Sequence, residues 1–302
     1  MSRNVEIVEV GPRDGLQNEA RTLTVPARLA FIRHLAASGL KRIEVGAFVS
    51  PEWVPQMQGS RELIVELFKK PPPKGVRYSA LVPNMRGMTD ALTTAIPEVA
   101  VFGACSETFS KKNINCTIAE SLERFRAVTA LARKEKRKVR GYLSVAFGCP
   151  YEGQVSQAKV IELVQAYLKL GVHEVSVGDT IGVATPKQVR SLLTKLKRKV
   201  PLKKIALHLH DTRGTALANV LAGLDLGVRV FDSSFGGLGG CPYAKGASGN
   251  LSTDDLIYML HGMGFKTGVN LSKLLEFSAT IQTEIGRKLP SRTAEAGLPL
   301  LR

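Results

Sequence analysis

Short apolar segments rich in β-branched residues recur along the chain, on average roughly every 35 residues. Most are continuous apolar runs and do not alternate with polar residues, which is typical of strands in a parallel sheet covered on both faces. We predict eight such strands, at Val5–Val10, Arg42–Phe48, Val76–Val82, Glu98–Gly103, Val139–Phe147, Glu174–Gly178, Ile205–His210 and Val230–Phe235.

Most of these segments are followed by a stretch in which apolar residues recur with the period of a helix. Local chemistry at helix starts supports several of them. Thr24 and Thr185 are suited to cap a helix, and Pro186 stands at a first helical position, where its fixed backbone angle fits. The predicted helices include Val25–Ser38, Ile118–Lys136, Ser156–Leu170, Pro186–Lys197 and Thr215–Leu226.

Eight βα units in sequence predict the α/β class and a TIM (β/α)8 barrel. The alternative is a doubly wound open sheet, which usually has fewer strands and a glycine-rich phosphate turn after the first. Here that turn reads Gly11-Pro12-Arg13-Asp14-Gly15, which favours the barrel. We expect a single catalytic domain over residues 1–302, with the barrel at about 5–262 and a C-terminal helix and tail at about 270–302. The added helix is predicted at Asn270–Lys288, and Pro290–Arg302 is predicted to fray.

The 302-residue chain carries 42 basic and 26 acidic residues, a net charge of +16. Such an excess favours anionic partners, either nucleic acid or a polyphosphate cofactor. The basic residues are scattered, and the densest run, 133–138, falls at a predicted helix end, where positive charge complements the helix dipole. Aromatic residues are not interleaved with basic ones as single-strand binding requires. We therefore predict no nucleic-acid partner.

Membrane insertion and secretion are not expected. No apolar run approaches the ~18 residues that a membrane span needs. Residues Met1–Asn4 are too short for a secretory signal before the first predicted strand. The four cysteines form no C-x-x-C pair, and a chain of this length does not need disulfides. We predict a cytoplasmic protein with reduced thiols.

The pair His208 and His210 is the sharpest chemical signal. Side chains at i and i+2 of a strand point to the same face, so two imidazoles can converge on one cation. Asp14, at the end of the first predicted strand, is the natural third ligand, and Asn250 offers a neutral oxygen from the loop after the last strand. This ligand set favours Mg²⁺ or Mn²⁺, one per chain, although Zn²⁺, Fe²⁺ and Co²⁺ also accept such ligands.

Further polar residues lie at the predicted strand ends, where a TIM barrel has its active site. They are Arg13 after the first strand, Glu44 in the second and Asp179 after the sixth. The glycine-rich segment Gly236–Asn250 contains Cys241, which is either a catalytic proton donor or nucleophile or a small apolar residue that packs the loop. We favour the catalytic thiol.

Several motifs together resemble the 3-hydroxy-3-methylglutaryl-CoA lyase family. The resemblance runs from about Val5 to Ile285, and its first and last motifs are the most specific. The matching segments are VEVGPRDGLQNE (8–19), FVSPEWVPQM (48–57), KKNINC (111–116), GCPYEG (148–153), GDTIGVATP (178–186), HLHDT (208–212) and GGLGGCPYAKGASGN (236–250).

The resemblance implies a divalent-metal-dependent carbon–carbon lyase that cleaves 3-hydroxy-3-methylglutaryl-CoA to acetyl-CoA and acetoacetate. It implies a small-molecule acyl-CoA substrate and a homodimer. The family's residue roles carry over to matching positions: metal ligands at Asp14, His208, His210 and Asn250, a substrate-contacting arginine at Arg13, a loop cysteine at Cys241, and active-site acids at Glu44 and Asp179.

Other enzyme families remain alternatives to the lyase. Other metal-dependent aldol or Claisen-type barrels, such as 2-isopropylmalate synthase relatives and aldolases, share the Arg-Asp motif and the H-x-H pair. The Gly236–Asn250 segment with Cys241 favours the lyase. A paralogue acting on a bulkier 3-hydroxyglutaryl-CoA is a further alternative. Two positions depart from the family pattern: Ala47, where relatives often have Ser, and Arg213, where the animal enzyme has Tyr.

Overall fold

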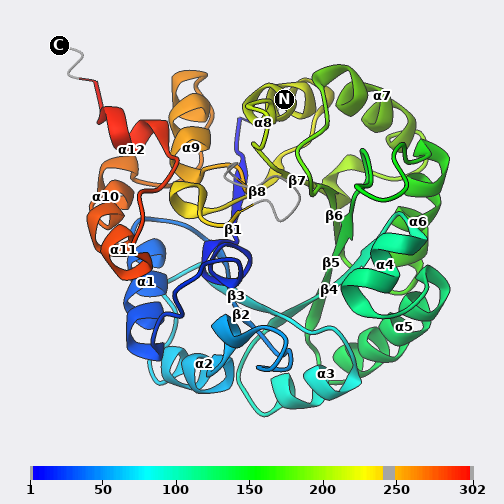
Figure 1. Cartoon of the computed structure of the whole chain (residues 1–302), viewed down its shortest axis with the longest axis horizontal. Coiled ribbons are helices and arrows are strands. Elements are labelled where there is room, and N and C mark those ends of the chain that lie inside the picture. The colour runs from blue at the N-terminus through cyan, green and yellow to red at the C-terminus, as the bar shows by residue number, and fades with distance from the viewer. Residues whose placement is uncertain (1–2, 241–248, 300–302) are drawn as a thin grey trace.

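The computed structural model describes residues 3–240 and 249–299, and in it eight parallel strands form a closed barrel (Figure 1). Each strand pairs with the next along the chain, and β8 pairs with β1, with Ile7 opposite Phe231. The strands are β1 (Glu6–Glu9), β2 (Arg42–Ala47), β3 (Arg77–Leu81), β4 (Glu98–Ala104), β5 (Lys138–Ser144), β6 (Glu174–Asp179), β7 (Ile205–Leu209) and β8 (Val230–Ser233).

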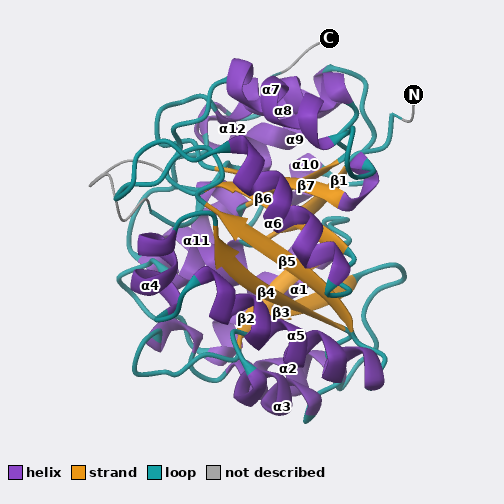
Figure 2. Ribbon diagram, turned by 90° about the vertical axis from the view of Figure 1, so that its right-hand side faces the viewer, coloured by secondary structure: helices purple, strands orange, loops and turns teal. Residues whose placement is uncertain are grey.

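Helices surround the barrel and cover the outer face of its strands (Figure 2). They are α1 (Val25–Ala37), α2 (Ser60–Phe68), α3 (Met85–Leu92), α4 (Glu107–Ile114), α5 (Ile118–Lys134), α6 (Gln157–Lys169), α7 (Pro186–Leu196), α8 (Ala216–Leu226), α9 (Thr253–Gly262), α10 (Leu271–Leu275), α11 (Ser278–Ile285) and α12 (Arg292–Ala296).

The predicted TIM barrel is confirmed, and the doubly wound alternative is wrong because β1 and β8 pair and leave no open edge. All eight predicted strands are present, most of them shorter by a residue or more at one or both ends than the apolar runs suggested. The predicted caps also form. Thr24 accepts a hydrogen bond from the Ala27 N–H at 3.3 Å, and the N–H of Thr185 donates to Gln188 at 2.9 Å.

The C-terminal prediction needs correction. The single helix expected at Asn270–Lys288 is two helices, α10 and α11. Between them the Phe277 ring stacks on Phe31 of α1, with centroids 5.8 Å apart, so the break between the two helices is packed against α1.

The expected fraying of Pro290–Arg302 is also wrong for the part that the structure describes, since α12 lies within it. Ser291 caps this helix by accepting from the Ala294 N–H at 3.0 Å. Asp255 of α9 accepts from the Thr293 N–H at 2.7 Å, so α12 is anchored on its neighbour. Within the described ranges, no helix has the length and apolar character required to cross a membrane.

Candidate metal centre and active site

Three of the predicted metal ligands come together at the carboxyl ends of the strands. His208 belongs to β7 and His210 follows it, and their Nε2 atoms lie 3.1 Å apart. Oδ2 of Asp14 lies 3.9 Å from Nε2 of His208. One potential ligand atom from each residue lies within 4.8 Å of the other two. The spacing that predicted convergence therefore produces it.

Asn250, the fourth predicted ligand, also reaches this cluster. It forms an isolated bridge with His210, and its Nδ2 donates to Asp14 Oδ2 at 2.9 Å. Asp14 is carried by a short helical turn, Gly11–Gly15, directly after β1. Gly15 allows that turn to sit against the chain after β8, because a Cβ there would lie 2.8 Å from Leu238 Cβ. The first and last strands thus deliver their ligands side by side.

The chemistry of these donors fits a divalent cation. Oδ1 of Asn250 is buried without a hydrogen-bond partner in the part of the chain that the structure describes, so this oxygen is available to a cation. Burial, together with the neighbouring His208, lowers the pKa of His210 to about 3, so this imidazole is neutral near pH 7. Burial alone would raise the pKa of Asp14, but Arg13 and the two imidazoles lower it, so Asp14 is anionic. Neutral imidazoles and an anionic carboxylate are the forms that bind metal.

Arg13 lies beside the cluster and is held by carboxylates. Its Nη1 donates to Asp14 Oδ1 at 2.6 Å, and its Nε pairs with Glu44 of β2. Burial alone would lower the pKa of Arg13, but Glu44 and Asp14 raise it, so the guanidinium stays charged. The structure therefore brings Arg13 and Glu44 together as a fixed pair at the barrel mouth.

Asp179, at the end of β6, has a different set of partners. Its two oxygens accept hydrogen bonds from the Val183 and Ala184 N–H groups, both at 2.9 Å. Burial raises its pKa above the ordinary value, and these two backbone bonds partly offset the rise. Asp179 thus organises the loop between β6 and α7 and lies near His208.

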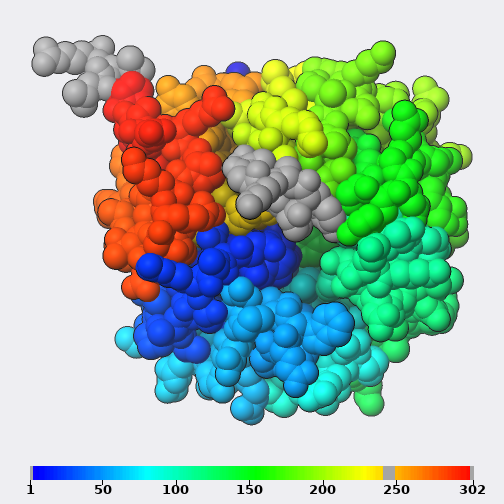
Figure 3. All heavy atoms as spheres, viewed as in Figure 1, coloured from blue at the N-terminus to red at the C-terminus, as the bar shows by residue number. Residues whose placement is uncertain are grey.

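Cys241 lies outside the described residues. Its neighbour Gly240 lines a cavity of about 330 Å³ at the barrel mouth, together with Arg13, Asp14, His208, His210 and Trp53. The space-filling view shows residues from the N-terminal and middle parts of the chain meeting around the centre of this face (Figure 3). Three of the four predicted metal ligands, Asp14, His208 and His210, therefore face one shared cavity with Arg13.

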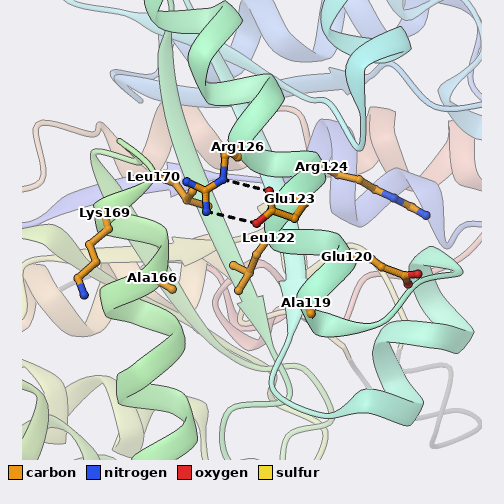
Figure 4. A pocket seen from close by; sticks show the side chains of 9 residues that line it. All are labelled: Ala119, Glu120, Leu122, Glu123, Arg124, Arg126, Ala166, Lys169 and Leu170. Atoms are coloured by element: carbon orange, nitrogen blue, oxygen red, sulfur yellow. Dashed lines mark hydrogen bonds and ion pairs between the residues drawn. The ribbon is translucent and has the colours of Figure 1, made fainter.

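A larger hollow, about 780 Å³, lies on the outside of the barrel between α5 and α6 (Figure 4). Five of the nine residues that line it are charged, and two of these form an ion pair on its wall, with Arg126 Nε 3.1 Å from Glu123 Oε2. None of the residues considered for chemistry lines it. Size alone does not identify the functional site.

Some residues around the cavity were not found from the sequence. The Tyr142 hydroxyl of β5 donates to Glu44 at 3.0 Å, and the Arg13 guanidinium lies 5.3 Å from its ring centroid. Asp232 of β8 lies behind His208, with Ser176 of β6 bonded to it at 2.6 Å. The available signal was polar residues inside otherwise apolar strands, which in a barrel must face the interior.

A closed barrel with a candidate divalent-cation centre at the carboxyl ends of its strands defines the class of metal-dependent TIM-barrel enzymes. Comparison with known proteins narrows this class. Residues 4–281 match the family model described as HMGL-like. The chain belongs to this HMGL-like family.

Individual relatives cover nearly the whole chain. It is 50% identical over 296 residues to the mitochondrial hydroxymethylglutaryl-CoA lyase of Homo sapiens, covering 98% of this chain and 90% of that protein. It is similar to the HMG-CoA lyase structure of Bacillus subtilis, with a TM-score of 0.95, 46% identity, and coverage of 98% and 99%. An HMG-CoA lyase of Acinetobacter baumannii, solved with coenzyme A and 3-methylmalate, gives a TM-score of 0.93, 35% identity, and coverage of 99% and 97%.

Proposed function

We propose that this protein is a divalent-metal-dependent carbon–carbon lyase that cleaves 3-hydroxy-3-methylglutaryl-CoA to acetyl-CoA and acetoacetate. The observation that carries the proposal is the convergence of Asp14, His208 and His210 at the mouth of an HMGL-like barrel. Relatives that share about half of the sequence are named for this reaction. We propose that the catalytic unit is one domain over residues 1–302, and a family match that extends from the first strand into the C-terminal helices supports this.

Asp14, His208, His210 and Asn250 would hold the cation, with Mg²⁺ or Mn²⁺ preferred by this oxygen and nitrogen donor set. When bound there, the cation lowers the pKa of the substrate's C3 hydroxyl and fixes its orientation. Asp14 and Asn250 are already joined by a 2.9 Å hydrogen bond, so the two ends of the chain supply a preorganised pair of ligands.

Two residues are candidates to accept the hydroxyl proton, Asp14 and Asp179. The pKa of Asp179 is raised by burial and that of Asp14 is lowered by its cationic neighbours. A general base works best when its pKa approaches the working pH, which favours Asp179. Each of its oxygens has a further lone pair beside the one used by a backbone N–H.

Loss of that proton lets the C3 oxygen become a ketone while the C2–C3 bond breaks, and the bonding electrons pass to the thioester as an enolate. Arg13 would face the thioester oxygen, where its fixed charge stabilises the enolate. Glu44 and Tyr142 hold Arg13 in place. Cys241 would then give its thiol proton to C2, which completes acetyl-CoA; its neighbour Gly240 lines the same cavity.

The decisive test is direct. Purified protein with Mg²⁺ or Mn²⁺ is incubated with 3-hydroxy-3-methylglutaryl-CoA, and acetoacetate is followed over time, with a chelator as control. A matched incubation with acetyl-CoA and a 2-oxo acid tests the synthase alternative. Release of acetoacetate in the first incubation, with no condensation in the second, supports the proposal. Condensation alone, or cleavage that survives complete demetallation, contradicts it.

The thiol role has its own test. Cys241→Ala is expected to keep Mn²⁺ and substrate affinity close to native and to slow cleavage by about 10²- to 10⁴-fold, the usual contribution of a positioned proton donor. Cleavage at the native rate in Cys241→Ala would assign the proton to another group. Cys105→Ala is the matched control, because Cys105 is buried and does not line the cavity.

The remaining expectations concern partners and place. The net charge of +16 would assist capture of the coenzyme A phosphates, with Lys111 and Lys112 of α4, in the KKNINC segment, as candidate contacts. Lys112 Nζ lies 4.9 Å from the centroid of the Tyr151 ring, so this ammonium group already contacts an aromatic face. A homodimer and a cytoplasmic location stay predictions.

A further inference from the structure

A carboxylate lies on the edge of the His208 ring opposite the candidate metal centre. Nε2 of this ring faces His210 Nε2 at 3.1 Å, whereas Nδ1 lies 3.4 Å from Oδ2 of Asp232. The two nitrogens of an imidazole point in nearly opposite directions, so the ring stands between the cation ligands and Asp232. Asp232 itself is fully buried and does not belong to the ligand cluster.

Asp232 is held on all sides by donors. Arg140 donates to Oδ1 at 2.6 Å through Nη2 and to Oδ2 at 3.2 Å through Nη1. The Ser176 hydroxyl donates to Oδ2 at 2.6 Å. Two donors from one guanidinium and a third from a hydroxyl are the partners of an ionised carboxyl group. The group that His208 meets is therefore a carboxylate, which can only accept a hydrogen bond.

Behind Arg140, a ladder of buried charges keeps this carboxylate in place. Arg140 Nε donates to Glu174 Oε1 at 2.7 Å, and Glu174 in turn receives Arg42 Nη2 at 2.8 Å. Arg42 also lies 3.5 Å from Glu98 Oε1. Since Arg42, Glu98 and Glu174 are first residues of β2, β4 and β6, the ladder extends along the barrel interior toward the end opposite the cavity.

From this arrangement we infer that Asp232 is a positioning residue, which keeps the proton of His208 on Nδ1 and so leaves Nε2 unprotonated and aimed at the cation. The inference rests on the proposed metal centre. An acceptor at Nδ1 dictates the tautomer, because the neutral ring has one proton and the other nitrogen must carry the lone pair. Carboxylates behind metal-binding imidazoles orient the ring and raise its basicity.

The substitution Asp232→Asn separates tautomer control from simple packing. Arg140 has only donors and makes its shorter contact, 2.6 Å, with Oδ1, so we expect the carboxamide oxygen to take the Oδ1 place. The NH₂ group then takes the Oδ2 place, where the Ser176 hydroxyl can turn to accept from it. That NH₂ group then donates to Nδ1, and the ring proton moves to Nε2. The protonated Nε2 has no lone pair with which to bind the cation. We expect Mn²⁺ affinity, measured by calorimetric titration, to fall by about 10- to 100-fold.

Glu174→Gln is the matched control. It removes one negative charge from the same buried ladder and from the same arginine, but Glu174 is not among the partners of His208. We expect Mn²⁺ affinity within a few-fold of native in Glu174→Gln, even though thermal stability falls in both variants. Equal losses of Mn²⁺ affinity in the two variants would reduce Asp232 to a structural role and overturn the inference.

A spectroscopic readout keeps the test independent of folding losses and of turnover. In metal-free native protein, ¹⁵N-labelled at histidine, the His208 signals should be those of the Nδ1–H tautomer, and in Asp232→Asn those of the Nε2–H tautomer. An Nε2–H tautomer in the native protein would overturn the inference even if the variant did not fold. If instead the native protein has the Nδ1–H tautomer and binds Mn²⁺ but cleaves no acyl-CoA, the proposed function fails and the inference stands.

Discussion

Arg13 shows how a buried charge can be kept ready for a substrate. The guanidinium has five N–H donors in a planar fork, and two carboxylates, Glu44 and Asp14, engage only part of it. The Tyr142 ring packs against the guanidinium, whose central carbon Cζ lies 5.3 Å from the ring centroid. Arg13 lines the cavity and keeps N–H groups that these two carboxylates do not engage, so a thioester oxygen would meet a charge that needs no reorganisation.

Arg13→Met therefore tests the fixed charge. We expect kcat for cleavage to fall by about 10²- to 10³-fold or more, the usual loss for one donor to a developing oxyanion. Mn²⁺ affinity should stay within a few-fold of native, because Arg13 is not a ligand. Steady-state kinetics and calorimetric titration measure the two quantities. Arg190→Met, which removes an exposed arginine paired with Asp225, is the control and should keep native kinetics.

The proposed role of Asn250 as a metal ligand rests on its side-chain oxygen, which forms no hydrogen bond with the described residues. Its Nδ2 is bonded to Asp14, but its buried Oδ1 has no partner among the described residues. We expect Asn250→Ala to weaken Mn²⁺ binding by at least 10-fold, because one ligand is lost and Asp14 is no longer oriented. Calorimetric titration of the metal measures the loss.

Asn219 of α8 provides an unusually close control for that substitution. It is also fully buried, its Oδ1 also lacks a partner in the described ranges, and its Nδ2 donates to Ala184 O at 3.0 Å. Asn219→Ala should lose stability and keep Mn²⁺ affinity. Comparable losses of affinity in the two variants would show that Asn250 acts through packing and not as a ligand.

At the scale of elements, the helix and strand boundaries that depend on neighbouring residues could be predicted from the sequence, whereas those that depend on long-range packing could not. The start of α1 is encoded by Thr24 and the residues next to it, so sequence alone locates it. The break between α10 and α11 depends on Phe277 stacking against Phe31, far away in the chain, and no local pattern marks it.

The same division holds for the candidate site. His208 and His210 share a strand end, so their spacing is visible in the sequence, whereas Asp232 reaches His208 only through the register of β7 and β8. Arg213, flagged as a departure from the family pattern, donates to the carbonyls of Ile181 and Gly182 at 2.9 and 3.0 Å. It therefore fixes the loop after β6, a contact that the sequence did not reveal.

Glu9 joins three elements and gives the fold a pH dependence. It accepts from the Gly11 and Phe235 N–H groups, both at 2.8 Å, and from the Thr253 hydroxyl at 2.7 Å. Burial raises its pKa from 4.5 to about 7, although these hydrogen bonds oppose the rise. Between those two values the folded protein keeps a proton that the unfolded chain has released.

The free energy of unfolding should therefore fall as the pH rises from about 4.5 to about 7. The contribution of Glu9 is fully present below the unfolded pKa and is lost as the pH passes the folded one. The loss is of order 3 kcal/mol for this one group. In Glu9→Gln the oxygen keeps the two backbone bonds and the NH₂ group donates to Thr253, so this part of the slope should disappear.

Guanidinium unfolding at pH 5, 6, 7 and 8 measures the slope in both proteins. Asp254 of α9, whose pKa burial also raises to about 7, should leave a residual slope of the same sign in Glu9→Gln. An unchanged slope in the variant would show that Glu9 does not carry the retained proton.

For the whole molecule, the barrel must close before its centre exists. Asp14 follows β1 and Asn250 follows β8, and these two strands pair over four residues. Arg287, beyond α11, donates to Glu19 Oε2 at 2.8 Å, so the C-terminal segment is fastened to the same mouth. A cation bound there therefore links the beginning and the end of the chain, and the unfolded chain offers no comparable site.

Because the ion binds only the closed barrel, it should raise the melting temperature in proportion to the logarithm of its concentration. Mn²⁺ at 100 times its dissociation constant contributes about 2.7 kcal/mol, which for a chain of 302 residues is a rise of roughly 4 °C. Circular dichroism melts over a Mn²⁺ series, with chelator as the starting point, measure the rise. It should vanish in Asp14→Asn, since the carboxylate that joins the strand-one turn to the imidazoles is gone. A rise that persists in Asp14→Asn would mean that the ion binds elsewhere on the protein, and the assignment of the centre to this cluster would be wrong.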